Sequence, residues 1–232
     1  MKINCREKRR AEPVLIRPTA RRHRHRQRWR ANPSAFCYYV IEHLSGVDFE
    51  KREVVKIRNR YDASVPTVVG AVERQKPVFV EDARFLRQLT SQPIKWALPG
   101  PMTMIDTLYD NHYKSREKLA WEFAKILNQE ARELEAAGVD IIQFDEPAFN
   151  VFFDEVNDWG IAALERAIEG LKCETAVHIC YGYGIKANTD WKKTLGTEWR
   201  QYEEAFPKLQ TSNMILSHWS AITRGCLWIC SS

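Results

Sequence analysis

The sequence has few cysteines, few glycines and no long apolar run, and each shortage excludes a class of protein. Six Cys among 232 residues are too few for a disulfide-rich secreted scaffold, so we expect a reducing, cytoplasmic setting. No apolar run approaches the roughly 18 residues of a membrane span, and the N-terminus lacks the apolar core of a secretory signal. Ten Gly and a hydrophobic share of 44% exclude collagen-like and wholly disordered chains. A globular protein that does not insert into a membrane is therefore expected.

Basic residues are concentrated at the N-terminus. Residues 1–35 hold 12 Lys and Arg against 2 Asp and Glu, a net charge of +10, whereas the whole chain carries +5. The other residues must then carry −5, so a basic tail is attached to a mildly acidic body. The run Arg21–Arg30 (RRHRHRQRWR) repels itself and buries little surface, so we expect residues 1–35 to be a disordered tail. It could act as a nucleic-acid-binding arm, but a solvated extension is favoured because the body has no nucleic-acid-binding motif.

Apolar runs and amphipathic stretches alternate in the middle of the chain. Ile94–Leu98, Val139–Phe144 and Thr175–Cys180 are short and apolar, as is typical of buried parallel strands. Ser115–Ala137 and Asp158–Ile168 have helical periodicity, and each begins with a residue suited to capping a helix. This alternation predicts βαβ units and an α/β fold with a parallel sheet.

The flanking regions give weaker patterns. Tyr38–Leu44 has helical spacing, Val54–Ile57 and Val65–Val72 resemble strands, Pro77–Leu89 ends in a helix, and a further helix is expected at Thr197–Ala205. Periodicity does not separate a closed barrel from an open doubly wound sheet. The chain has no GxGxxG or P-loop motif, which disfavours the nucleotide-binding versions of the open sheet.

Two adjacent acids follow the predicted strand Val139–Phe144. Asp145 and Glu146 lie where a parallel strand ends, which is where α/β folds place their active sites. Burying two carboxylates there is costly unless something pairs with them. They would bind an ammonium group or act as acid and base; alternatively, Asp145 caps a loop and Glu146 pairs with an Arg.

Two further positions have residues suited to binding. His178 and Cys180 end the next strand at positions i and i+2, which share a face, and they would make half of a tetrahedral zinc site. A hydrogen-bonded His beside a buried thiol is the more common arrangement. Gly100 lies between two prolines after the predicted strand Ile94–Leu98. A glycine there would let the backbone approach a ligand closely, although a turn shaped by the prolines explains the glycine equally well.

Four segments in this order resemble the catalytic domain of cobalamin-independent methionine synthase, particularly its short bacterial homologues. They are Lys76–Leu86 (KPVFVEDARFL), Pro93–Met104 (PIKWALPGPMTM), Glu133–Ala148 (ELEAAGVDIIQFDEPA) and Val177–Tyr181 (VHICY). The resemblance runs from about Tyr38 to Asn213.

The resemblance implies a (β/α)8 TIM barrel with zinc at the C-terminal ends of its strands. It implies transfer of a methyl group from 5-methyltetrahydrofolate, in its polyglutamate form, to homocysteine to give methionine. By similarity His178 and Cys180 would be zinc ligands, and Asp145 would hold the substrate ammonium group. The residues expected to line the substrate site are Asp145, Glu146, Gly100, Pro101 and Thr103. A related barrel that uses a methylated corrinoid protein as donor is an alternative, and the sequence does not choose between the donors.

The chain departs from the family at both ends. The family completes its zinc site with a later Glu and a further Cys, but Ser212–Trp219 contains no Glu and the resemblance ends at residue 213. We therefore expect a barrel portion at 36–213, incomplete at its C-terminal end, and a non-matching tail at 214–232, as a shifted reading frame or truncated gene would produce. Low stability and little zinc-dependent activity are expected, although His218, Cys226 and Cys230 are chemically suitable replacement ligands. The sequence gives no indication of oligomeric state.

Overall fold

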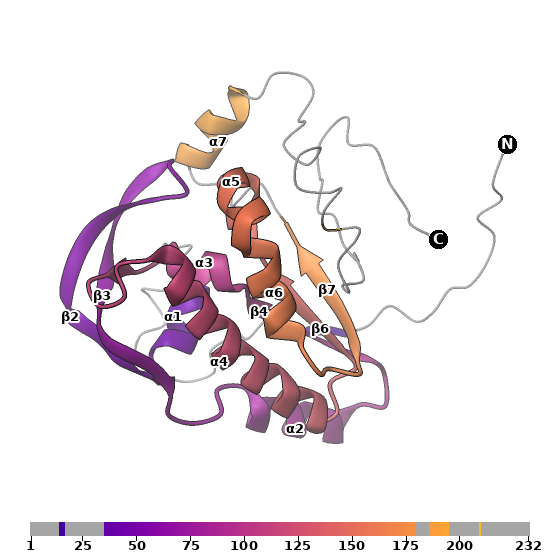
Figure 1. Ribbon diagram of the computed structural model, residues 1–232. Helices are drawn as coiled ribbons and strands as arrows, with labels where there is room; N and C mark the ends of the chain where they lie inside the picture. Colours follow the sequence, from indigo (N-terminus) through magenta and orange to yellow (C-terminus); the bar gives the residue numbers. More distant parts are fainter. Residues whose placement is uncertain (1–13, 17–34, 180–185, 195–208, 210–232) are drawn as a thin grey trace, which may run out of the picture.

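The computed structural model describes residues 14–16, 35–179, 186–194 and 209 (Figure 1). Several sequence-based predictions lie outside the described residues. They concern the basic run Arg21–Arg30, the ligand Cys180, the helix Thr197–Ala205 and the tail at 214–232. These stay predictions.

The main sheet contains four parallel strands in the order β1-β4-β6-β7. The strands are β1 (Val14–Ile16), β4 (Ile94–Pro99), β6 (Ile141–Asp145) and β7 (Glu174–His178). The helices α4 (Arg116–Ala136) and α6 (Ile161–Ile168) lie side by side in front of this sheet (Figure 1). The predicted α/β class with a parallel sheet is confirmed. The described residues supply four strands of that sheet, and a closed eight-stranded barrel stays a prediction.

The two faces of the sheet differ because side chains alternate along a strand. Trp96, Leu98 and Phe144 point to the helix-covered face and join the hydrophobic core with Phe123 of α4. The opposite face, which would be the interior of a closed barrel, is lined at the same level by smaller and polar residues, namely Lys95, Ala97, Gln143 and Ala176. Polar chemistry is therefore possible on this second face.

The helix α4 begins where the sequence predicts. The Ser115 side chain accepts a hydrogen bond from the Lys118 N–H, as an N-cap residue does. The prediction that Asp158 caps the next helix is wrong. Residues 153–160 already wind as α5 (Phe153–Glu155) and the π-helical turn η2 (Val156–Gly160), so Asp158 lies within a helical turn and α6 follows from Gly160.

A long hairpin forms a second sheet. The strands β2 (Leu44–Ile57) and β3 (Tyr61–Arg74) pair antiparallel, and β5 (Tyr109–Asp110) adds to β3 in parallel. The predicted strand pieces cover less than half of this hairpin, because exposed charged residues interrupt the apolar alternation at 50–53. Figure 1 shows the hairpin curving along one side of the molecule.

Short helices connect these parts. They are α1 (Ala35–Ile41), α2 (Val80–Leu89), α3 (Pro101–Ile105), the 3-10 turn η1 (Pro147–Asn150) and α7 (Lys186–Lys193). The predicted helix at Tyr38–Leu44 starts and ends earlier, because Leu44 already belongs to β2. Within the described ranges no helix is long and apolar enough to cross a membrane.

Candidate functional site

The C-terminal ends of three neighbouring strands meet at one edge of the main sheet. Pro99 of β4 lies opposite Asp145 of β6, and Asp145 lies opposite His178 of β7. The Gly100 N–H donates to the Asp145 carbonyl at 2.9 Å, and the Glu146 N–H donates to the His178 carbonyl at 2.8 Å. The structure therefore brings together the three places that the sequence singles out, apart from Cys180, which is not among the described residues.

Asp145 is a half-buried carboxylate held by its own strand. The Gln143 side-chain N–H donates to Asp145 Oδ1 at 2.6 Å, which is possible because residues i and i+2 of a strand share a face. Lys95 is buried on the same face. Burial lowers the pKa of Lys95, and the negative charge of Asp145 opposes that shift. Asp145 thus lies among polar groups that are largely shielded from water.

Glu146 is fully buried and its carboxylate is occupied. One oxygen accepts from the Met102 N–H at 2.9 Å, and the other accepts from the Thr103 N–H at 2.9 Å and the Thr103 hydroxyl at 2.7 Å. Burial raises the pKa of Glu146 to about 8, although these three hydrogen bonds oppose the shift. The geometry favours a role for Glu146 in fixing the start of α3 over direct contact with a substrate.

Position 100 has no room for a side chain, which explains the glycine there. A Cβ atom on Gly100 would overlap the Glu146 side chain. Pro101 begins α3 and is buried. Thr103 is also buried, and its hydroxyl accepts from the Ala148 N–H at 3.4 Å. Gly100 and the first turn of α3 therefore form a packed support directly beside Asp145.

His178 offers one side chain suited to a metal. It is 8% exposed and lies beside Asp145 at the end of β7. Within the part of the chain that the structure describes, no three His, Cys, Asp or Glu side chains gather so that they could hold a metal ion. The described residues thus fit one corner of a metal site, and a complete set of ligands is not found among them.

The tip of the hairpin reaches the same edge of the sheet. Arg60 donates to the Asn150 side chain at 2.8 Å and to that of Asn188 at 3.3 Å, and it stacks 3.4 Å from the ring centroid of Trp191. Figure 1 shows α7, which holds Asn188 and Trp191, against the end of the hairpin. The hairpin therefore ties together segments that follow β6 and β7.

A buried ion pair anchors the same hairpin tip to α3. Arg58 Nε lies 3.8 Å from Asp106 Oδ2, and the backbone N–H of Arg58 donates to that oxygen at 3.1 Å. Burial raises the pKa of Asp106 to about 6, and the positive charge of Arg58 opposes the shift. Arg58 and Asn59 both have positive φ, at 48° and 55°, in a turn that usually contains glycine.

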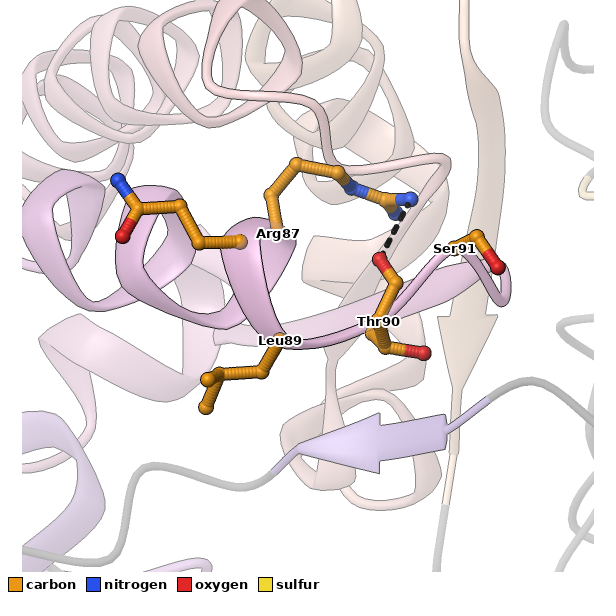
Figure 2. A pocket seen from close by; sticks show the side chains of 5 residues that line it. Arg87, Leu89, Thr90 and Ser91 are labelled. Atoms are coloured by element: carbon orange, nitrogen blue, oxygen red, sulfur yellow. Dashed lines mark hydrogen bonds between the residues drawn. The ribbon is translucent and has the colours of Figure 1, made fainter.

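An open hollow lies at the opposite end of the strands. Its lining is Arg87, Gln88, Leu89, Thr90 and Ser91, from the end of α2 and the loop that follows (Figure 2). Arg87 pairs with Asp140 at 2.6 Å, and Asp140 accepts from the first N–H of β4 at 2.7 Å. Polar groups at the N-terminal ends of parallel strands generally stabilise the fold, so this hollow is not the candidate site.

The sequence patterns do not assign Gln143, Lys95 or the hairpin tip to this edge. A signal was present for the first two, since each is a polar residue inside an otherwise apolar strand. The hairpin tip has no such signal, because an Arg-Asn turn without glycine does not indicate a hairpin.

The chain is similar to known proteins over a region that includes these strand ends and the residues around them. Residues 34–184 match the family model described as "Cobalamin-independent synthase, Catalytic domain". A methionine synthase of Sulfurisphaera tokodaii is 35% identical over 145 residues, which are 62% of this chain and 42% of that protein. A 5-methyltetrahydropteroyltriglutamate–homocysteine methyltransferase of Citrobacter koseri is 34% identical over 152 residues, which are 62% of this chain and 20% of that protein.

A solved structure is also similar. It is a B12-independent methionine synthase from Shewanella sp. W3-18-1 in complex with selenomethionine, with a TM-score of 0.73 and 88% sequence identity. The match covers 75% of this chain and 51% of that one. The chain thus spans about half the length of the Shewanella protein, and less than half the length of each of the two relatives above.

Proposed function

The chain belongs to the family of the cobalamin-independent synthase catalytic domain, and we propose on that basis that it takes part in methyl transfer to the sulfur of homocysteine, forming methionine. The observation that carries the proposal is the register of the strand ends, which places Asp145 next to His178. In an amino-acid thiol, the ammonium group would pair with Asp145 and the sulfur would bind a metal held by His178. The names of the similar proteins, which include methionine synthase and a homocysteine methyltransferase, support the same reaction.

Asp145 is proposed to bind the ammonium group of the substrate. A carboxylate is a charge-assisted acceptor for an ammonium group, and the strand-end position leaves Asp145 half-buried. Partial burial strengthens such a pair because the surrounding dielectric is lower than that of water. The similar Shewanella protein is described in complex with selenomethionine, an amino acid of the same shape as the proposed product.

The proposed metal is Zn²⁺, with His178 and Cys180 as ligands. Zinc would supply one chemical function, which is to hold the homocysteine sulfur as a thiolate at neutral pH. His178 is suited to this role by its place at the strand end, whereas Cys180 is outside the described residues. A reducing, cytoplasmic setting suits thiol chemistry, and Cys37 and Cys173 are both free thiols.

The proposed methyl donor is a methylated folate, with a methylated corrinoid as the alternative. Gly100, Pro101 and Thr103 are proposed to shape the substrate site as packed residues at the start of α3, and Glu146 to hold that start in place. No described contact distinguishes the two donors, so the experiment below includes both.

The test is methionine formation by the purified chain with zinc and homocysteine. One arm contains 5-methyltetrahydropteroyltriglutamate and the other methylcobalamin. We expect a low rate in the folate arm that falls at least tenfold in Asp145→Asn, because an amide does not replace the charged acceptor. Asp154→Asn, which alters an exposed carboxylate, is the matched control and should match the unaltered chain. No methionine in either arm, or equal rates with and without the Asp145 carboxylate, would contradict the proposal.

A further inference from the structure

Gln143 is a polar residue where the strand pattern calls for an apolar one. It is 3% exposed within β6, between the buried residues Ile142 and Phe144. Burying an amide costs free energy unless it is hydrogen-bonded, so a Gln at this place needs a partner. Its side chain donates to Asp145 at 2.6 Å, and an ionised carboxylate can only accept, so the direction of this bond is fixed by chemistry.

The neighbouring strands leave room for this contact. Gln143 lies opposite Ala97 of β4 and Ala176 of β7, and paired residues on adjacent strands share a face. Two alanines leave the amide space to extend along its own strand towards Asp145. A longer side chain at either position would compete for that space.

We propose that Gln143 is a positioning residue which holds the Asp145 carboxylate in the orientation that accepts the ammonium group of the amino-acid substrate. This inference rests on the proposed function, because it presupposes that Asp145 binds that group. A carboxylate has about four lone-pair sites, and the bond from Gln143 to Oδ1 occupies one of them while fixing how the group is turned. Gln143 therefore acts through Asp145 and does not itself touch the substrate.

The test compares two ligands that differ only in the amino group. L-homocysteine carries it and 4-mercaptobutanoate lacks it, while both carry the thiol and the carboxylate. Dissociation constants are measured by calorimetry with one equivalent of zinc for the unaltered chain, Gln143→Met and Asp145→Asn. Methionine at position 143 keeps the length of the side chain and removes the donor. Gln129→Met, on an exposed face of α4, is the matched control.

We expect the unaltered chain and Gln129→Met to prefer homocysteine, and Asp145→Asn to lose that preference. Gln143→Met should bind homocysteine at least about tenfold more weakly, because it loses a hydrogen bond to a charged group, and should bind 4-mercaptobutanoate unchanged. Equal weakening for both ligands, or an unchanged preference, would overturn the inference and leave the proposed function standing. If the unaltered chain has no preference for the amino compound, the proposed function itself fails.

Discussion

Buried carboxyl groups lie at both ends of the short helix α3. Glu146 accepts hydrogen bonds from the first N–H groups of α3, and Asp106 ends it, paired with Arg58. A carboxyl group is favourable at a helix N-terminus, where the backbone donors point outwards. At residue scale, therefore, the acids of this region serve two purposes: Glu146 and Asp106 hold α3, and the half-buried Asp145 is the one proposed to meet a ligand.

Asp106 should make stability depend on pH. Its pKa in the folded protein is raised to about 6, so the folded state keeps its proton at pH values where the unfolded state has lost it. The free energy of unfolding should therefore fall as pH rises from about 4 to about 6, by roughly 2 kcal/mol between pH 4.5 and 7. Urea unfolding at the two pH values measures this contribution as the difference between the unaltered chain and Asp106→Asn. Asp154→Asn, at an exposed position, should keep the full pH dependence; an Asp106→Asn profile parallel to that of the unaltered chain would refute the assignment.

Gly100 should tolerate no side chain. Gly100→Ala forces a methyl group into the Glu146 carboxylate, and relieving the overlap should lower the free energy of unfolding by about 1–3 kcal/mol. Gly70→Ala is the matched control, because the nearest atom to its new Cβ would be the Gly46 Cα at 3.8 Å, an ordinary contact. The two variants are compared by urea unfolding at pH 7. Equal stability of both would show that the Glu146 side chain can move aside.

At the scale of elements, the hairpin of β2 and β3 is held at both ends. Its tip contacts α3, η1 and α7 through Arg58 and Arg60. Near its base, Arg74 is buried against α4, where it pairs with Glu130 at 2.6 Å and Glu133 at 2.7 Å. The hairpin thus links the C-terminal half of α4 to the strand-end edge.

Removing the Arg74 guanidinium should weaken the attachment of the hairpin base to α4 and lower the stability of the protein. Arg74→Met leaves the Glu130 carboxylate buried without its ionic partner, which typically costs about 3–5 kcal/mol. Arg84→Met breaks an exposed pair with Glu81 and should cost less than about 1 kcal/mol. Thermal unfolding of both variants provides the comparison. Similar losses in the two would mean that burial does not set the strength of the Arg74 network.

Some elements could be predicted from sequence and others could not, for physical reasons. The strand at Val139–Phe144 and the helix capped by Ser115 are each specified by their own residues, through apolar runs and a local hydrogen bond. The hairpin is only partly predictable, because its turn at Arg58 and Asn59 contains no glycine and the charged residues at 50–53 interrupt the apolar alternation. Asp145 and His178 can be placed from strand ends alone, but the Gln143 contact and the carboxylate partners of Glu146 depend on side-chain packing that the strand pattern does not specify.

At the scale of the whole molecule, the strand-end edge joins segments that are far apart in sequence. β4, β6 and β7 end side by side at Pro99, Asp145 and His178. The hairpin tip contacts η1, which follows β6, and α7, which follows β7. The family resemblance identified from sequence is confirmed over residues 34–184. Parallel strands alone do not specify closure of a barrel, because the same βαβ units also build open sheets.

The most direct test of the account is the zinc content of the dialysed chain, measured by atomic emission with and without homocysteine. His178 and Cys180 would make half of a tetrahedral site, and the homocysteine sulfur would add a third donor. We therefore expect well below one zinc per chain without homocysteine, a clear rise with it, and no rise in His178→Ala. His112→Ala, at an exposed position, should behave like the unaltered chain. Zinc that is unaffected by homocysteine, or retained equally in His178→Ala, would contradict a thiol-binding metal site at the end of β7.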